Sequence, residues 1–289
     1  MSEPPFPAQT ARSVLLITLD SCRYDTFEAA NVPNMKAVGP LHRAMSPSHF
    51  TFGSHASLFV GFTPGVANRL EAYVNPKFGK IFKIRHGGFG GPGGAFFELY
   101  GENIIQGFKQ LGYWALGTAG VGWFNPKTEA GKMLTRDFDR FFYPPTQPDL
   151  HAQLDWLSGE LKQTRPPVFV FVNVGETHVP YHFAGADWDA SEDPCRPFKT
   201  ERNDAGKCRT RQRACVEFAD RMLAPLLEAF RAGTTLICAD HGDCWGEDGL
   251  WEHGIHHEKT LEVPLLYRLG GAPGKPAGNG QDLVGRGPN

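Results

Sequence analysis

Asp240 and His241 form the most distinctive pair of chemistry-bearing residues in this 289-residue sequence. They directly follow the apolar run Thr234–Ala239, whose continuous hydrophobicity predicts a strand that is covered on both faces. A carboxylate beside an imidazole offers oxygen and nitrogen ligands to one metal ion, and Gly242 permits a sharp turn away from the strand. We therefore predict a metal site at the end of this strand.

Further histidines follow the same strand, at His253, His256 and His257. Their nitrogen atoms can bind phosphate oxygens or a second ion. A purely structural role does not account for so many histidine and acidic residues next to a fully apolar strand.

Asp20 stands in the same position after a second apolar run, Val14–Leu19. A carboxylate at the exit of a buried strand is a natural ligand for a hard cation, because desolvation favours pairing it with a positive charge. The alternative role is that of a helix N-cap for the segment that follows. Asp25, a few residues on, is interpreted as an ion-pair partner of Arg23.

A run of hydroxyl-bearing residues precedes an apolar helical stretch that ends at Gly61. A hydroxyl at a helix N-terminus meets free N–H groups and the positive end of the dipole, which favour an alkoxide and a phosphoryl group attached to it. Ordinary helix capping is the alternative. Local sequence does not choose among the candidates Ser46, Ser48, Thr51, Ser54 and Ser57.

Glu176 and His178 follow a third apolar run, Val168–Val174. His178 can donate to a substrate oxygen or protonate a leaving group, or it can be a loop histidine satisfied by its neighbours. Because sites in open α/β sheets form beyond the carboxyl ends of the strands, the three polar clusters are expected to meet at one edge of one sheet.

The elements that must position these residues alternate between short apolar runs and helical patterns, which predicts parallel strands joined by crossover helices. We expect an α/β three-layer sandwich with a mostly parallel central sheet, in a single domain over residues 1–289 with its core at about 13–268. Strands are predicted at 14–19, 168–174, 234–239 and 263–267, and helices at 104–111, 150–163 and 210–232. Pro225 lies inside the last helix and is expected to kink or divide it.

Two segments are predicted to be irregular. Residues 77–96 are rich in glycine and indicate a loop or lid rather than a packed element. Residues 183–205 are polar and are interpreted as a surface excursion, and the Gly- and Pro-rich tail from Gly270 is expected not to pack.

Composition bounds the class of protein. The chain is 41% hydrophobic and 21% charged, with a formal net charge of −2 and no local run of Lys and Arg, so we expect neither a nucleic-acid nor a membrane partner. The first apolar stretch is too short for a signal peptide or a transmembrane helix, and the expected location is cytoplasmic. The six cysteines are predicted to be free thiols; the alternative is a structural metal bound by Cys195, Cys208 and Cys215.

The quoted segments together resemble the alkaline-phosphatase superfamily, which includes sulfatases, phosphodiesterases, phosphonate monoester hydrolases and phosphoethanolamine transferases. The string DHGDCWGEDGLWEHG, followed by a strand containing Val263 and Pro264, is similar to the late Asp-His-Gly block of sulfatases and phosphoethanolamine transferases. GETHVPY resembles the G-x-H-x-P-Y turn of the same families. The resemblance extends from about residue 13 to residue 267.

The resemblance also selects the nucleophile. TFGSHASLFVGFTP is similar to the phosphodiesterase segment in which the leading threonine attacks, and it keeps the ten-residue step from nucleophile to Gly61 seen in sulfatases. This alignment implies that Thr51 attacks and that His55 stands where sulfatases carry an arginine. The formylglycine motif Cys-x-Pro-x-Arg is absent, which moves the expected chemistry from sulfate to phosphate esters.

The implied activity is a metal-dependent hydrolysis of a small-molecule phosphomonoester, phosphodiester or phosphonate ester through a phospho-threonine. The implied cofactor is a divalent metal, Zn²⁺ or Mn²⁺, with one well-defined site and room for a second. Alternatives are a transferase or mutase of the same superfamily, a sulfate-ester hydrolase without formylglycine, and a non-catalytic metal-binding protein. The implied metal ligands are Asp20, Thr51, Asp240 and His241; the implied catalytic residues are Thr51, His178 and His253; and the implied substrate-binding residues are His55, Glu176, His256 and His257.

Overall fold

A seven-stranded sheet with the order β2-β11-β8-β1-β7-β5-β6 forms the centre of the computed structural model, which describes residues 4–61, 82–85, 96–99 and 102–271. The strands β1, β7, β8, β5 and β6 run parallel, whereas β11 is antiparallel to both of its neighbours. The strand bounds are β1 Val14–Leu19, β2 His42–Met45, β5 Trp114–Ala119, β6 Arg140–Phe142, β7 Val168–Val174, β8 Thr234–Ala239 and β11 Glu262–Arg268.

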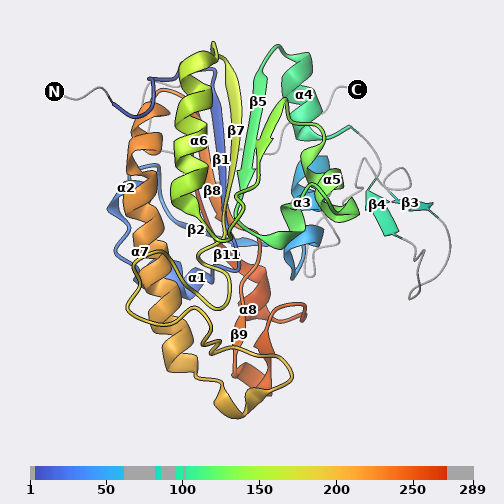
Figure 1. Ribbon diagram of the computed structural model, residues 1–289, viewed down its shortest axis with the longest axis vertical. Coiled ribbons are helices and arrows are strands. Elements are labelled where there is room, and N and C mark those ends of the chain that lie inside the picture. The colour runs from blue at the N-terminus through green and yellow to red at the C-terminus, as the bar shows by residue number, and fades with distance from the viewer. Residues whose placement is uncertain (1–3, 62–81, 86–95, 100–101, 272–289) are drawn as a thin grey trace, which may run out of the picture.

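Helices cover both faces of the sheet, which makes three layers (Figure 1). One face carries α1 (Tyr24–Ala29), α2 (Pro33–Lys36), α6 (Leu150–Gln163) and α7 (Ala205–Ala229). The other face carries α3 (Thr51–Val60), α4 (Ile104–Gln110) and α5 (Glu129–Thr135). The expected three-layer α/β sandwich with a mostly parallel sheet is thereby confirmed.

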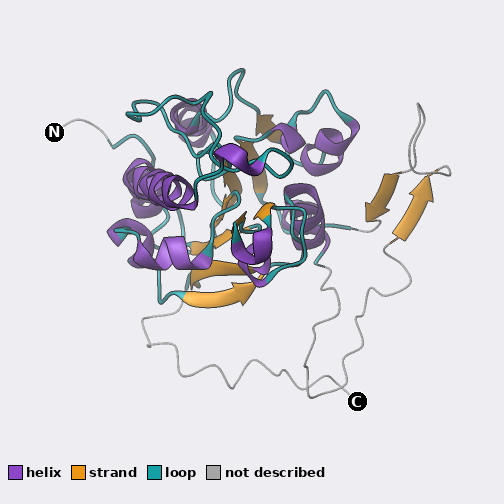
Figure 2. Cartoon of the chain, turned by 90° about the horizontal axis from the view of Figure 1, so that it is seen from below, coloured by secondary structure: helices purple, strands orange, loops and turns teal. Residues whose placement is uncertain are grey.

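The smaller elements lie around this sandwich (Figure 2). They are α8 (Glu258–Leu261), the paired strands β9 (Cys244–Trp245) and β10 (Trp251–Glu252), the paired strands β3 (Phe82–Arg85) and β4 (Phe96–Leu99), and the short helices η1 (Gly122–Phe124), η2 (Thr200–Arg202) and η3 (Glu247–Gly249).

Strand β7 shows how the sequence builds two separate cores. Its residues read VFVFVNV and are all buried. Because successive side chains of a strand point to opposite faces, the valines join the core under α6 and α7, and the phenylalanines join the core under α3, α4 and α5. The alternation also turns Asn173 towards the phenylalanine face, next to Thr18 of β1.

Most predicted elements are present with close bounds, and two predictions need correction. The strand predicted at 263–267 is β11, which is antiparallel to β8 rather than parallel. The helix predicted from residue 210 begins at Ala205, because the Asp204 side chain caps it by accepting from the Lys207 backbone N–H. Pro225 lies within this helix without dividing it.

The two segments predicted to be irregular also differ from expectation. Strand β3 falls within the predicted Gly-rich loop, while residues 77–81 and 86–95, and the tail from 272, lie outside the described residues. The segment 183–205 is not all surface, because Cys195 is fully buried and packs with Tyr181, Cys208 and Trp245. All six cysteines have free thiols. Within the described ranges, no helix has the length and apolar character needed to cross a membrane.

We predict that Phe171→Ala lowers the free energy of unfolding by about 3–5 kcal/mol, because it empties the centre of the phenylalanine core. The Phe171 ring packs against those of Phe59, Phe124 and Phe138, at centroid distances of 5.2, 5.6 and 6.0 Å. Urea unfolding followed by circular dichroism measures the change. Phe198→Ala is the matched control, since that side chain is 94% exposed and its loss is expected to cost less than about 0.5 kcal/mol. Equal effects of the two substitutions would contradict this account of the core.

Candidate metal centre

Two buried aspartates lie side by side where β1 and β8 end. These neighbouring strands pair in parallel with Leu19 opposite Ala239, so the residues that follow them, Asp20 and Asp240, leave the sheet together. Both side chains are fully buried. Ligand atoms of Asp20, Asp240 and His241 all lie within 4.8 Å of one another. Asp20 does not cap the next helix, because the N-cap of α1 is Arg23, which pairs with Asp25 as predicted.

The Asp240 carboxylate is only half satisfied by the protein. Its Oδ1 accepts from the backbone N–H groups of Ser21 and His241, both at 3.0 Å. Its Oδ2 is buried without a hydrogen-bond partner and lies 3.5 Å from His241 Nε2. Burial and the nearby charge of Asp20 raise the pKa of Asp240 well above its usual range. An orphaned carboxylate oxygen between a second carboxylate and an imidazole nitrogen is the donor set of a divalent cation, so these residues fit a metal ion.

Thr51 brings its hydroxyl to the same point from the first turn of α3. Phe50, the residue before it, is extended and does not cap the helix with its side chain. The Thr51 Oγ1 atom lies 3.4 Å from Asp20 Oδ1 and 3.2 Å from His241 Nε2. A buried hydroxyl therefore meets both the ligand set and the positive end of a helix dipole, where anionic oxygens are stabilised.

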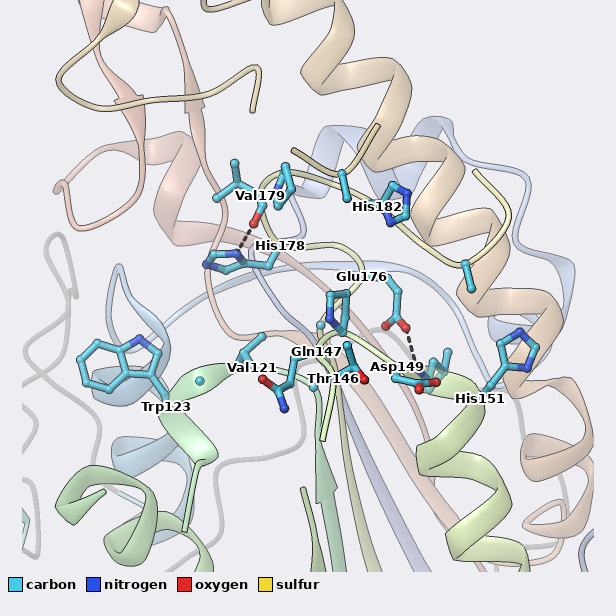
Figure 3. A pocket seen from close by; sticks show the side chains of 18 of the residues that line it. Val121, Trp123, Thr146, Gln147, Asp149, His151, Glu176, His178, Val179 and His182 are labelled. Carbon is cyan, nitrogen blue, oxygen red and sulfur yellow. Dashed lines mark hydrogen bonds between the residues drawn. The ribbon is translucent and has the colours of Figure 1, made fainter. Parts of the chain in front are cut away.

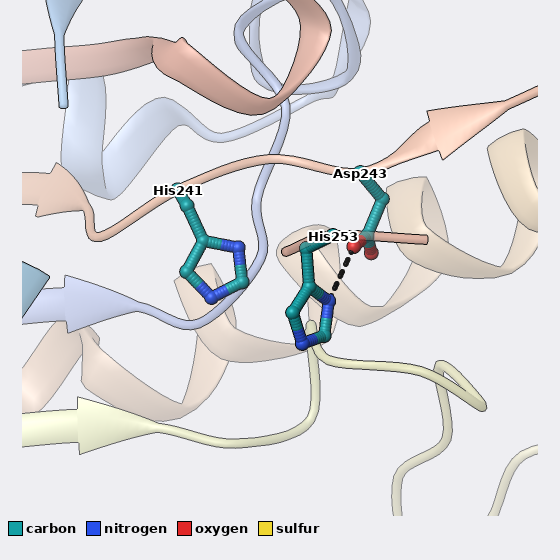
Figure 4. A group of neighbouring side chains, drawn as sticks. All are labelled: His241, Asp243 and His253. Atoms are coloured by element: carbon teal, nitrogen blue, oxygen red, sulfur yellow. Dashed lines mark hydrogen bonds and ion pairs between the residues drawn. The ribbon is translucent and has the colours of Figure 1, made fainter. Parts of the chain in front are cut away.

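Three histidines around this point share one orientation. In each of them Nδ1 faces an acceptor: the Gly242 carbonyl for His241 at 3.1 Å, the Val179 carbonyl for His178 at 2.7 Å, and Asp243 Oδ1 for His253 at 2.8 Å. Figure 4 shows the last of these contacts beside His241. A fixed Nδ1–H leaves Nε2 as the free nitrogen, which is the way metal- and substrate-binding histidines are commonly oriented.

The three rings form a continuous row. The His241 and His253 centroids are 4.5 Å apart, and those of His253 and His178 are 5.1 Å apart. Burial and the neighbouring His253 lower the pKa of His241 to about 4, so this imidazole is neutral and can act as a ligand. Burial also works against a charge on His253, but the hydrogen bond with Asp243 outweighs it and raises the pKa of His253 to about 9.

Asp243 belongs to the candidate site, although its position in the sequence did not single it out. It is fully buried, and its second oxygen accepts from the Tyr181 hydroxyl at 2.7 Å, which in turn accepts from Trp245 Nε1 at 2.8 Å. This chain fixes Asp243, and Asp243 fixes His253. The string DHGD indicates such a role, because it places a second acid three residues after Asp240. An acid buried in this turn needs a hydrogen-bond or ion-pair partner.

Two amides support the site in the same way. Asn173, the one polar residue of β7, donates to Asp20 Oδ2 at 3.2 Å. Gln212 of α7 donates to the carbonyls of Ser21 and Thr177, at 2.8 and 3.1 Å. The sequence could have indicated a role for Asn173, because this residue interrupts an apolar run. Gln212 gave no such signal, because only the fold brings its helix to these turns.

His55 does not occupy the position expected of a substrate-binding residue. It is fully buried, its Nδ1 donates to the Thr51 carbonyl at 2.8 Å, and its Nε2 lies 3.0 Å from Thr18 Oγ1. The Phe124 ring meets it edge-on at 4.9 Å. Both nitrogens are thus used within the protein, so His55 holds the first turn of α3 from behind instead of facing a substrate.

The remaining candidates lie apart from the ligand cluster or at its border. His257 caps α8 by accepting from the Lys259 N–H at 3.0 Å, and the His256 side chain is exposed; a substrate-binding role for either stays a prediction. Glu176 is 2% exposed, and burial raises its pKa to about 7. It lines a cavity together with His178 (Figure 3).

Comparisons with solved structures identify the fold. The C-terminal periplasmic domain of the phosphoethanolamine transferase EptC from Campylobacter jejuni is similar at a TM-score of 0.61 and 12% identity, over 90% of this chain and 80% of that one. The corresponding EcEptC domain from Escherichia coli, in a complex with Zn, gives 0.56 and 12%, over 92% and 76%. The phosphonate monoester hydrolase of Agrobacterium radiobacter gives 0.54 and 14%, over 89% and 68%.

The chain therefore has the fold of the alkaline-phosphatase superfamily, as the sequence resemblance implied. No protein-family model and no curated protein sequence matches it. At these identities the comparisons establish the architecture, and the chemistry must be argued from the residues themselves.

We predict that Asp243→Asn returns the pKa of His253 towards the ordinary histidine value of about 6.5, because the charged partner is lost. In the metal-free wild type His253 is expected to titrate at about 9. Since this folded-state pKa is raised, the pair's contribution to stability is fully present below about pH 6.5 and is lost as the pH rises through about 9. Histidine NMR titration and thermal unfolding from pH 6 to 10 measure both effects. An unchanged His253 pKa in the variant would refute the assignment.

Proposed function

We propose that this protein hydrolyses phosphate esters, either phosphomonoesters, phosphodiesters or phosphonate esters, with the help of a divalent metal and through a phosphoryl group carried by Thr51. One observation carries the proposal. The Thr51 hydroxyl lies at a helix N-terminus in contact with both Asp20 and His241, which are themselves members of a buried group with the chemistry of a metal site.

Asp20, Thr51, Asp240 and His241 would hold the metal. Their mixed oxygen and nitrogen donors suit Zn²⁺ or Mn²⁺, and a Zn complex is known for a structure of the same fold. When bound, such an ion supplies Lewis acidity that favours the deprotonated threonine and offsets negative charge on the phosphoryl oxygens. The ligand atoms of His241, Asp243 and His253 also lie within 4.8 Å of one another, so a second ion would be held there by His253 in its deprotonated form, and the proton donor would then be His178.

The residues of the chain account for the remaining chemistry. The Thr51 oxygen forms a bond to phosphorus in line with the ester oxygen, whose bond to phosphorus breaks. N–H groups of the first turn of α3 face the phosphoryl oxygens and stabilise their charge. His253, protonated near neutral pH, or His178 gives a proton to the departing alcohol. Water then attacks phosphorus and gives a proton to the histidine that lost one, while the Thr51–phosphorus bond breaks and returns Thr51 to the deprotonated form in which it attacked.

Transfer to an alcohol in place of water is the second candidate, and it uses the same residues. A cavity of about 1180 Å³ beside His178 offers space for an organic acceptor, and a similar structure is that of a phosphoethanolamine transferase. Product analysis by phosphorus NMR, with and without added alcohols, separates the two activities. A small-molecule ester as the partner and a cytoplasmic location stay predictions from the sequence.

Thr51→Ala is expected to lower kcat on p-nitrophenyl esters by about 10³-fold or more, because it removes the nucleophile. The substrates are the phosphate monoester, phosphate diester, phosphonate and sulfate, each tested with metal-loaded protein. Mass spectrometry of acid-quenched wild type is expected to find one added phosphoryl group on the peptide that contains Thr51. Thr200→Ala, at an exposed position, serves as the control. Near-normal turnover by Thr51→Ala would rule out the mechanism.

Asp240→Asn is expected to weaken metal binding by at least about tenfold, because the orphaned Oδ2 and its charge are lost while the acceptor Oδ1 remains. Metal analysis after dialysis should give about one ion or more per wild-type chain and clearly less for the variant. Chelation should abolish wild-type turnover, and Zn²⁺ or Mn²⁺ should restore it. The control Asp187→Asn changes an exposed acid. Full metal content in Asp240→Asn would contradict the site.

A further inference from the structure

A cavity of about 1180 Å³ opens at the same edge of the sheet as the metal centre. Its walls come from the segments that follow β5 and β7 and from the start of α6, at 120–123, 175–180 and 146–151. In the view of Figure 3, Trp123 and His178 lie towards one end, His151 lies towards the other, and Glu176 lies between them. Apart from the acceptor site of the alternative transfer reaction, no role described above uses this space.

His178 joins the cavity to the metal centre. It lines the cavity, and its ring is 5.1 Å from His253, which is 4.5 Å from His241 beside the Thr51 hydroxyl. The row of three rings therefore runs from the Thr51 hydroxyl to the wall of the cavity. An ester whose phosphoryl group meets Thr51 would place its organic part in the cavity by extending along this row.

The permanently charged side chains of the lining are all acidic. Among the described residues that line the cavity there is no Lys or Arg, whereas Glu129, Asp149 and Glu176 contribute carboxylates. The lining also contains three imidazoles, of His151, His178 and His182. Glu129 is neutralised by Lys132 at 2.7 Å, but the other two acids have no basic partner of this kind in the wall. Apolar side chains, among them Val121 and Phe218, make up much of the remainder. Such a wall favours a cation on an apolar body and disfavours a second anion.

The surroundings of Glu176 indicate which chemical group the cavity recognises. It is 2% exposed, and its Oε1 accepts from the Leu150 backbone N–H at 2.6 Å. Its Oε2 is buried and has no hydrogen-bond partner among the described residues. A buried carboxylate oxygen without a donor is unfavourable, and an N–H donor brought in by a ligand relieves it with a charge-assisted hydrogen bond.

We infer that the cavity binds the alcohol part of the substrate, and that this part carries a cationic nitrogen group held by Glu176 on an apolar or aromatic body. The inference rests on the proposed function and makes it specific: the ester's phosphorus reaches Thr51 while an amine at the far end of the alcohol donates to Glu176 Oε2. Phosphate esters whose alcohol part is neutral are poorer substrates, and those with an anionic alcohol part are the poorest.

A series of para-substituted phenyl phosphates tests the inference. With metal-loaded full-length protein, kcat/KM for the aminomethyl ester should exceed that for the hydroxymethyl ester by about tenfold or more, and the carboxy ester should be slowest. Glu176→Gln keeps an acceptor for the Leu150 N–H but puts a donor where Oε2 was, so the amine preference should fall to about twofold or less. Glu228→Gln, an exposed change in α7, should keep the wild-type preference.

The affinities of the corresponding phenols, measured by calorimetry, test the cavity without requiring catalysis. They therefore distinguish a failure of this inference from a failure of the proposed function. If no ester is hydrolysed, the proposed function fails, and the cavity is still judged by whether 4-(aminomethyl)phenol binds more tightly than 4-(hydroxymethyl)phenol. Equal binding of the two phenols to the wild type, or the same amine preference in Glu176→Gln, overturns the inference. If Glu176→Gln does not fold, the wild-type order of amine, alcohol and carboxylate decides alone.

Discussion

Two buried carboxylates at adjacent strand ends are the constraint on which the rest of the structure depends. Asp20 and Asp240 are fully buried, and their ligand atoms lie within 4.8 Å of each other. At an effective dielectric constant of 20, two unit charges at this distance repel by about 3–4 kcal/mol. Either one carboxyl must hold a proton or a cation must lie between them. The raised pKa of Asp240 is the first solution, and a bound divalent ion is the second.

The supports of this centre are divided between the two faces of the sheet. On the phenylalanine face, His55 and Thr18 hold the first turn of α3 and with it the Thr51 hydroxyl. On the valine face, Gln212 of α7 holds the turns that follow β1 and β7. Because the Thr51 hydroxyl and the turns that follow β1 and β7 are held from different cores, the alternating pattern of β7 contributes to the geometry of the candidate site from a distance.

The sequence predicted the parts of the site that follow directly from strands. Asp20, Asp240 and His241 were found because the apolar runs before them are unambiguous, and parallel strands bring their carboxyl ends together. Thr51 was not separable from its neighbours by local pattern, and only the family resemblance selected it. The structure supplies a physical reason. The Ser46 and Ser54 hydroxyls hydrogen-bond to each other at 3.0 Å and to the Ser48 carbonyl, whereas the Thr51 hydroxyl meets Asp20 and His241. Gln212 and the burial of His55 depend on contacts between distant segments, which no local pattern encodes.

Helix α7 fixes the positions of two separate contacts relative to each other. It is about 38 Å long at 1.5 Å per residue. Gln212 donates to the carbonyls of Ser21 and Thr177 beside the candidate site. Asp220, two turns later, holds α2 by accepting from the Met35 and Asn34 N–H groups at 2.7 and 3.3 Å. One residue inserted between them would rotate Gln212 by about 100° relative to Asp220. The sheet would remain, but the hydrogen bonds from Gln212 to the carbonyls of Ser21 and Thr177 would be lost. The geometry of the candidate site therefore depends on the residue spacing along this helix as well as on the residues that could bind metal.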